Sequence, residues 1–107
     1  MPANHYSHGM PALKEREEAA ARKSERTAAI RLAQRVLSSY RIGMTIPRDT
    51  AEAAEEALRQ HVSDRQDMLC NALPALEQIA RGKSPTARRC ISAVTDLHEI
   101  ECLKPED

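Results

Sequence analysis

The stretch "YRIGMTIPRDTAEAAEEAL", from Tyr40 to Leu58, decides between two architectures for this chain of 107 residues. Within it Ile42, Met44 and Ile46 alternate with polar or small residues, which is the pattern of a β-strand with one apolar face. A short ribbon followed by helices can enter a groove of DNA, whereas a connector between helices cannot. The interpretation of these residues therefore separates two classes of function.

The segment before this stretch, residues 11–40, is rich in Ala, Glu, Arg, Lys and Leu, which favour an α-helix. Its second half carries an apolar stripe at helical spacing, formed by Ile30, Ala33, Val36 or Leu37, and Tyr40. Its first half has only alanines between charged residues and has almost nothing to bury. We therefore expect the N-terminal half of this helix to project from the domain or to lie on a second chain.

The segment after it predicts further helices. Asp49 in "DTAE" is expected to cap a helix, Pro74 to kink or break it, and Gly82 to end it. Ser84 is the expected cap of the last helix, which runs to about Leu103. The apolar stripes of these helices are Ala51, Ala54, Leu58, Val62, Leu69, Ala72, Leu76 and Ile79, and then Cys90, Ala93, Val94, Leu97 and Ile100.

The predicted fold class is all-α, with a long N-terminal helix, a short extended connector at residues 41–46 and an antiparallel helical hairpin. Residues 1–10 have no periodicity and are predicted to be a disordered leader, and residues 11–107 to form a single helical domain.

The composition limits the functions that the chain can have. It has no Trp or Phe and two Tyr, so its core is thin, and a homodimer is expected. Sixteen basic and sixteen acidic residues give no net charge, which argues against binding to nucleic acid without excluding it. No membrane span or signal peptide is recognisable, and three irregularly spaced Cys favour reduced thiols in the cytoplasm.

No pattern in the sequence points to catalysis, a cofactor or a metal. "GKS" at Gly82 to Ser84 lacks the earlier glycine and the preceding strand of a phosphate-binding loop. His98 and Cys102 have the spacing of two ligands on one helix, with His5 and His8 as further candidates, but no Cys-x-x-Cys pair accompanies them. Cys70 and Cys90 lie on or beside apolar stripes and are expected to be structural. The chain is therefore predicted not to be an enzyme.

Two resemblances give alternative functions. "RIGMTIPRD" followed by "VSDRQDMLCNAL" resembles the ribbon-helix-helix family, whose paired strands enter the major groove of DNA. That resemblance implies a DNA-binding transcriptional regulator in which Arg41 and Thr45 contact bases. Gly43 then occupies the central groove-facing position, where it offers no side chain.

The second resemblance is one of layout. A charged helical arm, the "IGMTIP" connector and the helical hairpin together resemble the QslA-type quorum-sensing antiactivators. This implies a homodimer that binds and inhibits a LuxR-type transcription factor by blocking its dimerisation. The predicted protein-binding residues are Leu32, Val36, Tyr40, Met44 and Ile46. We take this as the main hypothesis, with the DNA-binding regulator as the alternative.

Overall fold

The computed structural model describes residues 9–103, with side chains from Glu15 onward. It contains the helices α1 (Gly9–Arg41), α2 (Arg48–His61), α3 (Ala72–Ala80) and α4 (Ala87–Cys102), and the 3-10 segment η2 (Ser63–Leu69). The all-α class is confirmed, and residues 9–103 contain no strand. Most of the predicted leader, residues 1–8, lies outside the described residues, and Gly9 and Met10 belong to α1.

Gly43 ends α1 through a two-bond C-terminal cap. Its backbone N–H donates to the Tyr40 carbonyl at 3.0 Å, and the Met44 N–H donates to the Ser39 carbonyl at 3.1 Å. This Schellman arrangement requires a left-handed residue, and Gly43 has φ 89°. The connector expected at residues 41–46 therefore contains a tight turn, which interrupts the strand-like alternation, and residues 44–47 have no regular structure.

Gly82 ends α3 in the same way, as predicted. Its N–H donates to the Ile79 carbonyl at 3.1 Å, the Lys83 N–H donates to the Gln78 carbonyl at 2.7 Å, and its φ is 75°.

The two expected helix starts are wrong by one turn or less. α2 is preceded by Pro47 instead of Asp49, and Asp49 lies in its first turn. Pro47 suits this place because its extended backbone leaves its carbonyl free to accept from the Thr50 and Ala51 N–H groups, at 3.1 and 3.2 Å. At the start of α4, Thr86 replaces Ser84 as the cap, and its hydroxyl accepts from the Arg89 N–H at 3.1 Å.

The long apolar stripe is divided among three elements, α2, η2 and α3. The chain leaves α2 at Val62 and turns again at Cys70 and Asn71. Pro74 takes the third position of α3, where a missing N–H removes no intrahelical hydrogen bond. All eight residues of the predicted stripe are buried nonetheless: Ala51, Ala54, Leu58, Val62, Leu69, Ala72, Leu76 and Ile79.

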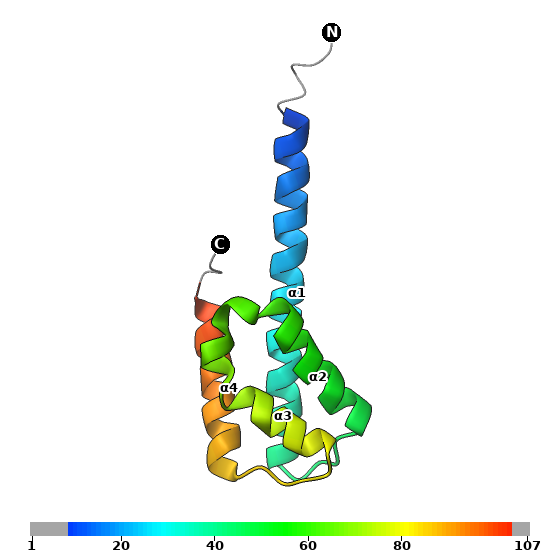
Figure 1. Ribbon diagram of the computed structural model, residues 1–107, viewed down its shortest axis with the longest axis vertical. Coiled ribbons are helices and arrows are strands. Elements are labelled where there is room, and N and C mark those ends of the chain that lie inside the picture. The colour runs from blue at the N-terminus through cyan, green and yellow to red at the C-terminus, as the bar shows by residue number, and fades with distance from the viewer. Residues whose placement is uncertain (1–8, 104–107) are drawn as a thin grey trace.

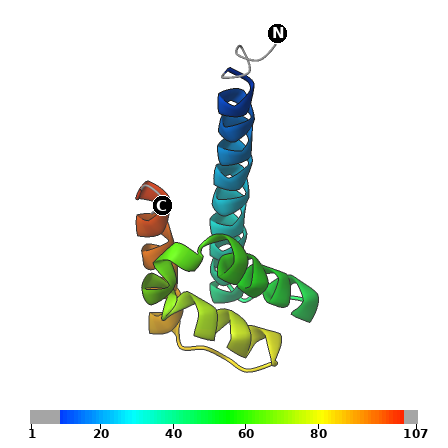
Figure 2. The same ribbon diagram turned by 45° about the horizontal axis from the view of Figure 1, so that its top comes forward.

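The helices pack around the C-terminal half of α1. α4 runs beside α1 in the opposite direction, and α2 and α3 lie across them (Figures 1 and 2). The predicted hairpin pairs the last helix with the segment before it, whereas the antiparallel neighbour of α4 is α1, and α3 meets α4 at a steep angle (Figures 1 and 2). The connection of residues 81–86 permits this angle, because the Gly82 turn and the buried Pro85 redirect the chain between α3 and α4.

The N-terminal half of α1 extends beyond the other helices (Figure 1), which gives the molecule dimensions of 63 × 24 × 18 Å. Residues 15–25, here called the arm, are all exposed. The expectation of a projecting helix half is confirmed. No helix in the described part of the chain is both long and apolar enough to cross a membrane.

Arg26 anchors the arm where it leaves the other helices. It is 7% exposed, forms an ion pair with Asp64 of η2, and donates to the His61 carbonyl at 3.5 Å. The adjacent Glu25 carboxylate lies 3.4 Å from the His61 ring nitrogen Nδ1. These contacts tie α1 to the corner between α2 and η2, so they fix the base of the arm.

Candidate protein-binding surface

A hollow of about 410 Å³ lies where the C-terminus of α1 meets the N-terminus of α4. It is lined from α1 and its cap by Tyr40, Arg41, Gly43 and Met44, and from the other side by Pro85, Ala87 and Cys90. The turn at Gly43 positions this wall because it folds Met44 back against the end of α1. We call this feature the α1–α4 hollow.

Large apolar side chains are exposed on and near the hollow. Met44 is 55% exposed and Ile42, next to Gly43, is 77% exposed. Ile91 is 47% exposed and lies one helical turn after Ala87, so it continues the same face of α4 away from the hollow. An exposed apolar group beside a concave surface is a common feature of protein-binding sites.

The predicted contact residues fall into three environments. Tyr40 and Met44 come together in the α1–α4 hollow. Leu32 and Ile46 are half-buried and pack against the core, and Val36 is 3% exposed within the core. Val36 therefore cannot contribute to an outer surface of this chain. Of the five predicted contact residues, Tyr40 and Met44 are the two that line the hollow, where a partner can reach them.

Ile42 and Ile91 are surface residues that the sequence analysis did not select. Ile42 was placed on the apolar face of a strand, whereas it caps α1 and points away from the core. Ile91 carried a usable signal, because it is out of phase with the buried residues Cys90, Ala93 and Leu97 of the same helix. A large apolar residue off the core stripe marks an exposed contact.

The residues of the DNA-binding alternative are both exposed. Arg41 is the last residue of α1 and lines the hollow, and Thr45 follows the turn at Gly43. They do not lie on a strand in this chain, since Gly43 adopts a left-handed turn between them. The ribbon-helix-helix assignment stays a prediction.

The neutral net charge conceals a strong separation of charges along the chain. Residues 26–48 contain five arginines and no acidic residue, and residues 78–95 contain four cations and no acidic residue. The acidic residues lie in residues 15–25, 49–77 and 96–107. Because the two basic segments meet at the α1–α4 hollow, the hollow lies in a positive region of the molecule.

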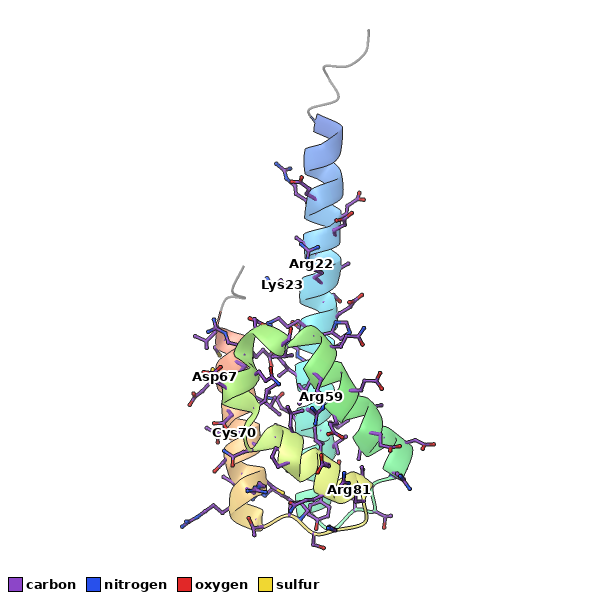
Figure 3. The ribbon with its side chains drawn as sticks, in the orientation of Figure 1. Arg22, Lys23, Arg59, Asp67, Cys70 and Arg81 are labelled. Atoms are coloured by element: carbon purple, nitrogen blue, oxygen red, sulfur yellow. The ribbon has the colours of Figure 1, made fainter. Side chains whose placement is uncertain are left out.

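Only part of this positive charge is neutralised nearby. Arg48 pairs with Glu52 at 3.5 Å, and Arg81 pairs with Glu77 at 3.7 Å. The exposed Arg41, Lys83 and Arg88 have no ion pair with another described residue. Figure 3 shows Arg81 beside the α3–α4 connection at this end, and Asp67 on η2 farther toward the arm. The N-terminus of α4 adds its positive dipole end to the same region.

Cys90 forms a fully buried part of the hollow wall. Burial raises the pKa of its thiol above the ordinary value, and the nearby Arg41 charge lowers it by a smaller amount. The net effect favours the neutral thiol, which is a poor nucleophile.

Among the described residues, no group of three or more His, Cys, Asp or Glu side chains is arranged to hold a metal ion. His5 and His8, the two further candidate ligands, lie outside the described residues. His98 and Cys102 are both exposed on α4.

No protein-family model matches the chain, and no curated protein or solved structure is significantly similar to it. The α1–α4 hollow and its charged surroundings therefore carry the functional argument.

Proposed function

We propose that this chain is a non-enzymatic regulatory protein that acts in the cytoplasm by binding another protein through the α1–α4 hollow. One observation carries the proposal. A concave surface lined by Met44, with the exposed Ile42 and Ile91 next in sequence to its lining residues Gly43 and Cys90, lies at the basic end of a protein without net charge.

The surface favours a partner with a particular chemistry. An apolar side chain can enter the hollow between Tyr40 and Met44, because those two residues and Ala87 are among the residues that line it. Asp or Glu residues beside that side chain would face Arg41 and Lys83. The apolar contact would provide most of the affinity, while the charged rim would accelerate association and favour acidic partners.

The resemblance to QslA-type antiactivators provides a first partner to test, the ligand-binding domain of a LuxR-type transcription factor. In that proposal the chain, itself a homodimer, inhibits the factor by blocking the factor's own dimerisation. The experiment is titration calorimetry of the purified protein against such a domain, with sedimentation of the mixture to follow the domain's dimerisation.

Met44→Asp is the informative variant. It places a carboxylate in the wall of the hollow, and we expect at least about tenfold weaker binding, because an apolar contact is replaced by a group that must be desolvated. The matched control is Leu103→Asp, the same kind of change at a residue that is 42% exposed at the far end of α4. Equal loss in both variants, or no loss in Met44→Asp, would contradict the hollow as the binding surface.

The DNA-binding alternative is favoured by one observation, the gathering of cations around Arg41 and Thr45. If it holds, DNA retention should fall steeply with salt, and Arg41→Ala should weaken binding by about 1 to 3 kcal/mol while the fold is kept. We expect Arg41→Ala to have a small effect on protein binding. Sequence-specific DNA binding that is lost in Arg41→Ala would replace the main proposal.

A further inference from the structure

The outer face of α1 carries a symmetric pattern of residues. Glu17, Ala20, Ser24, Ala28 and Arg31 follow one another at steps of three, four, four and three, so they form one stripe along the helix. All five are exposed, and the stripe lies opposite the core face that contains Ile30, Ala33 and Leu37. Small residues occupy its centre, an acid lies seven residues before Ser24, and a base lies seven residues after it.

A groove of about 560 Å³ follows this stripe. Ala20, Ser24 and Ala28 line it, with Arg31 and Arg35 toward the C-terminal end, and every lining residue belongs to α1. No other element of the described chain lines it, so this helix face is open except at Arg31, which contacts Glu101 of α4. Small side chains along its centre would allow a second helix to approach to about 8 Å, the close end of the usual range.

We propose that this face binds α1 of a second copy of the chain, with the two helices antiparallel and a two-fold axis at Ser24. In this register Ala20 lies opposite Ala28 of the second copy, and Glu17 lies opposite Arg31 of the second copy. By symmetry the same two contacts occur again on the other side of the axis. The inference rests on the homodimer of the proposed function and specifies its interface.

Charge complementarity selects this orientation over the parallel one. A parallel pair in register would place Glu17 against Glu17 and Arg31 against Arg31, and both contacts would be repulsive. The antiparallel pair replaces them with two attractive contacts. Arg31 can take part because its Nε and Nη2 contact Glu101, at 3.3 and 3.1 Å, while its side chain stays 65% exposed and Nη1 faces no described acceptor.

The exposure of the arm is a further reason to expect a second helix packed against the outer face of α1. α1 has 33 residues, or roughly 50 Å, and its first half extends beyond the packed helices (Figure 3, where Arg22 and Lys23 mark the arm). The projecting half taken alone is short enough to be only marginally stable in water without tertiary contacts. Antiparallel pairing would cover each arm with the outer face of the other chain's α1.

Cysteine cross-linking tests both the face and the direction. The exposed Cys70 and Cys102 are first replaced by Ser, and the buried Cys90 is kept. In the proposed register Ser24→Cys should form a covalent dimer under mild oxidation. Ala20→Cys alone should not, because the two introduced residues are eight positions apart along the axis, or about 12 Å, beyond the roughly 4.4 to 6.8 Å that a disulfide spans.

A mixture of Ala20→Cys and Ala28→Cys proteins should form a covalent heterodimer, because these positions lie opposite each other. Arg22→Cys, exposed on the side of the arm away from the stripe, is the control and should remain uncross-linked. Glu17→Arg should raise the dimer dissociation constant about tenfold, since two attractive contacts become repulsive. Circular dichroism verifies that each variant keeps its helices.

The outcomes separate the interface from the dimer itself. Cross-linking of Ala20→Cys as fast as Ser24→Cys would show a parallel pair and overturn the register. A dimer in sedimentation that no stripe cysteine cross-links would overturn this interface and leave the homodimer standing. A species of 11.9 kDa alone, up to about 100 μM, would overturn both.

Discussion

Substitution of Gly43 by alanine tests the connector against the ribbon, because the two arrangements predict opposite signs. In the structure Gly43 has φ 89° and closes the end of α1 through two backbone hydrogen bonds. An added Cβ would meet no atom within 4 Å, so the effect of the substitution comes from the backbone conformation and not from a clash.

The size of the effect follows from two opposing terms. An L-residue in the left-handed region costs about 1 to 2 kcal/mol. Alanine also restricts the unfolded chain, which returns about 0.4 to 1 kcal/mol to the folded state. We therefore expect Gly43→Ala to lower the free energy of unfolding by about 1 kcal/mol. In an extended ribbon the same change should instead stabilise the fold by about 0.5 to 1 kcal/mol.

The assay is urea unfolding followed by far-ultraviolet circular dichroism. Wild type and variant are compared with the same slope m, the dependence of the free energy of unfolding on urea concentration. Gly43→Asn is the matched control, since asparagine tolerates a left-handed backbone better than alanine and should cost less. Gly82→Ala, at φ 75° with an equally open Cβ position, should cost about as much as Gly43→Ala. A stabilised Gly43→Ala would refute the turn and favour an extended strand.

Two further predictions concern the protein interior. Asp64→Ala should lower the free energy of unfolding by about 2 kcal/mol, because it leaves the Arg26 charge buried without its ion-pair partner. Arg26→Met should cost less than about 1 kcal/mol, since it keeps an apolar side chain in that place and Asp64 is 21% exposed. Urea unfolding that gives the reverse order would contradict this account. Because burial raises the pKa of Cys90, the unfolded chain releases the thiol proton at a lower pH than the folded chain. The free energy of unfolding should therefore decline as the pH rises above about 8.5. Unfolding measured across this pH range should show a smaller decline in Cys90→Ala than in the wild type.

The buried faces could be predicted from the sequence because helical periodicity survives changes of helix direction. Each residue of the stripe from Ala51 to Ile79 is buried, although the stripe passes through α2, η2 and α3. Burial depends on the spacing of apolar residues within each turn. The turn after Val62 and the steep angle between α3 and α4 depend on contacts between elements, which the local sequence does not specify.

The helix ends were harder to predict because several residues near each end can act as a cap. Asp49 and Ser84 are good capping residues, but Pro47 and Thr86 lie within two residues of them and occupy the cap positions. Gly43 was read as part of an alternation, although a glycine directly after a long helix is also the usual signal of a C-terminal cap. The pattern allowed both, and the two backbone hydrogen bonds distinguish them.

The surface chemistry of this chain depends on how its charges are distributed and not on their sum. Sixteen bases and sixteen acids cancel in the net charge, yet two acid-free basic segments meet at the α1–α4 hollow, and the outer stripe of α1 has an acid at one end and a base at the other. The first arrangement favours an acidic partner, and the second favours another copy of the same helix in the opposite direction. Screening separates their effects, because raising the salt concentration weakens exposed charge pairs more than apolar contacts. Added salt should therefore slow partner association at the hollow, while small residues packed along α1 retain part of the dimer contact.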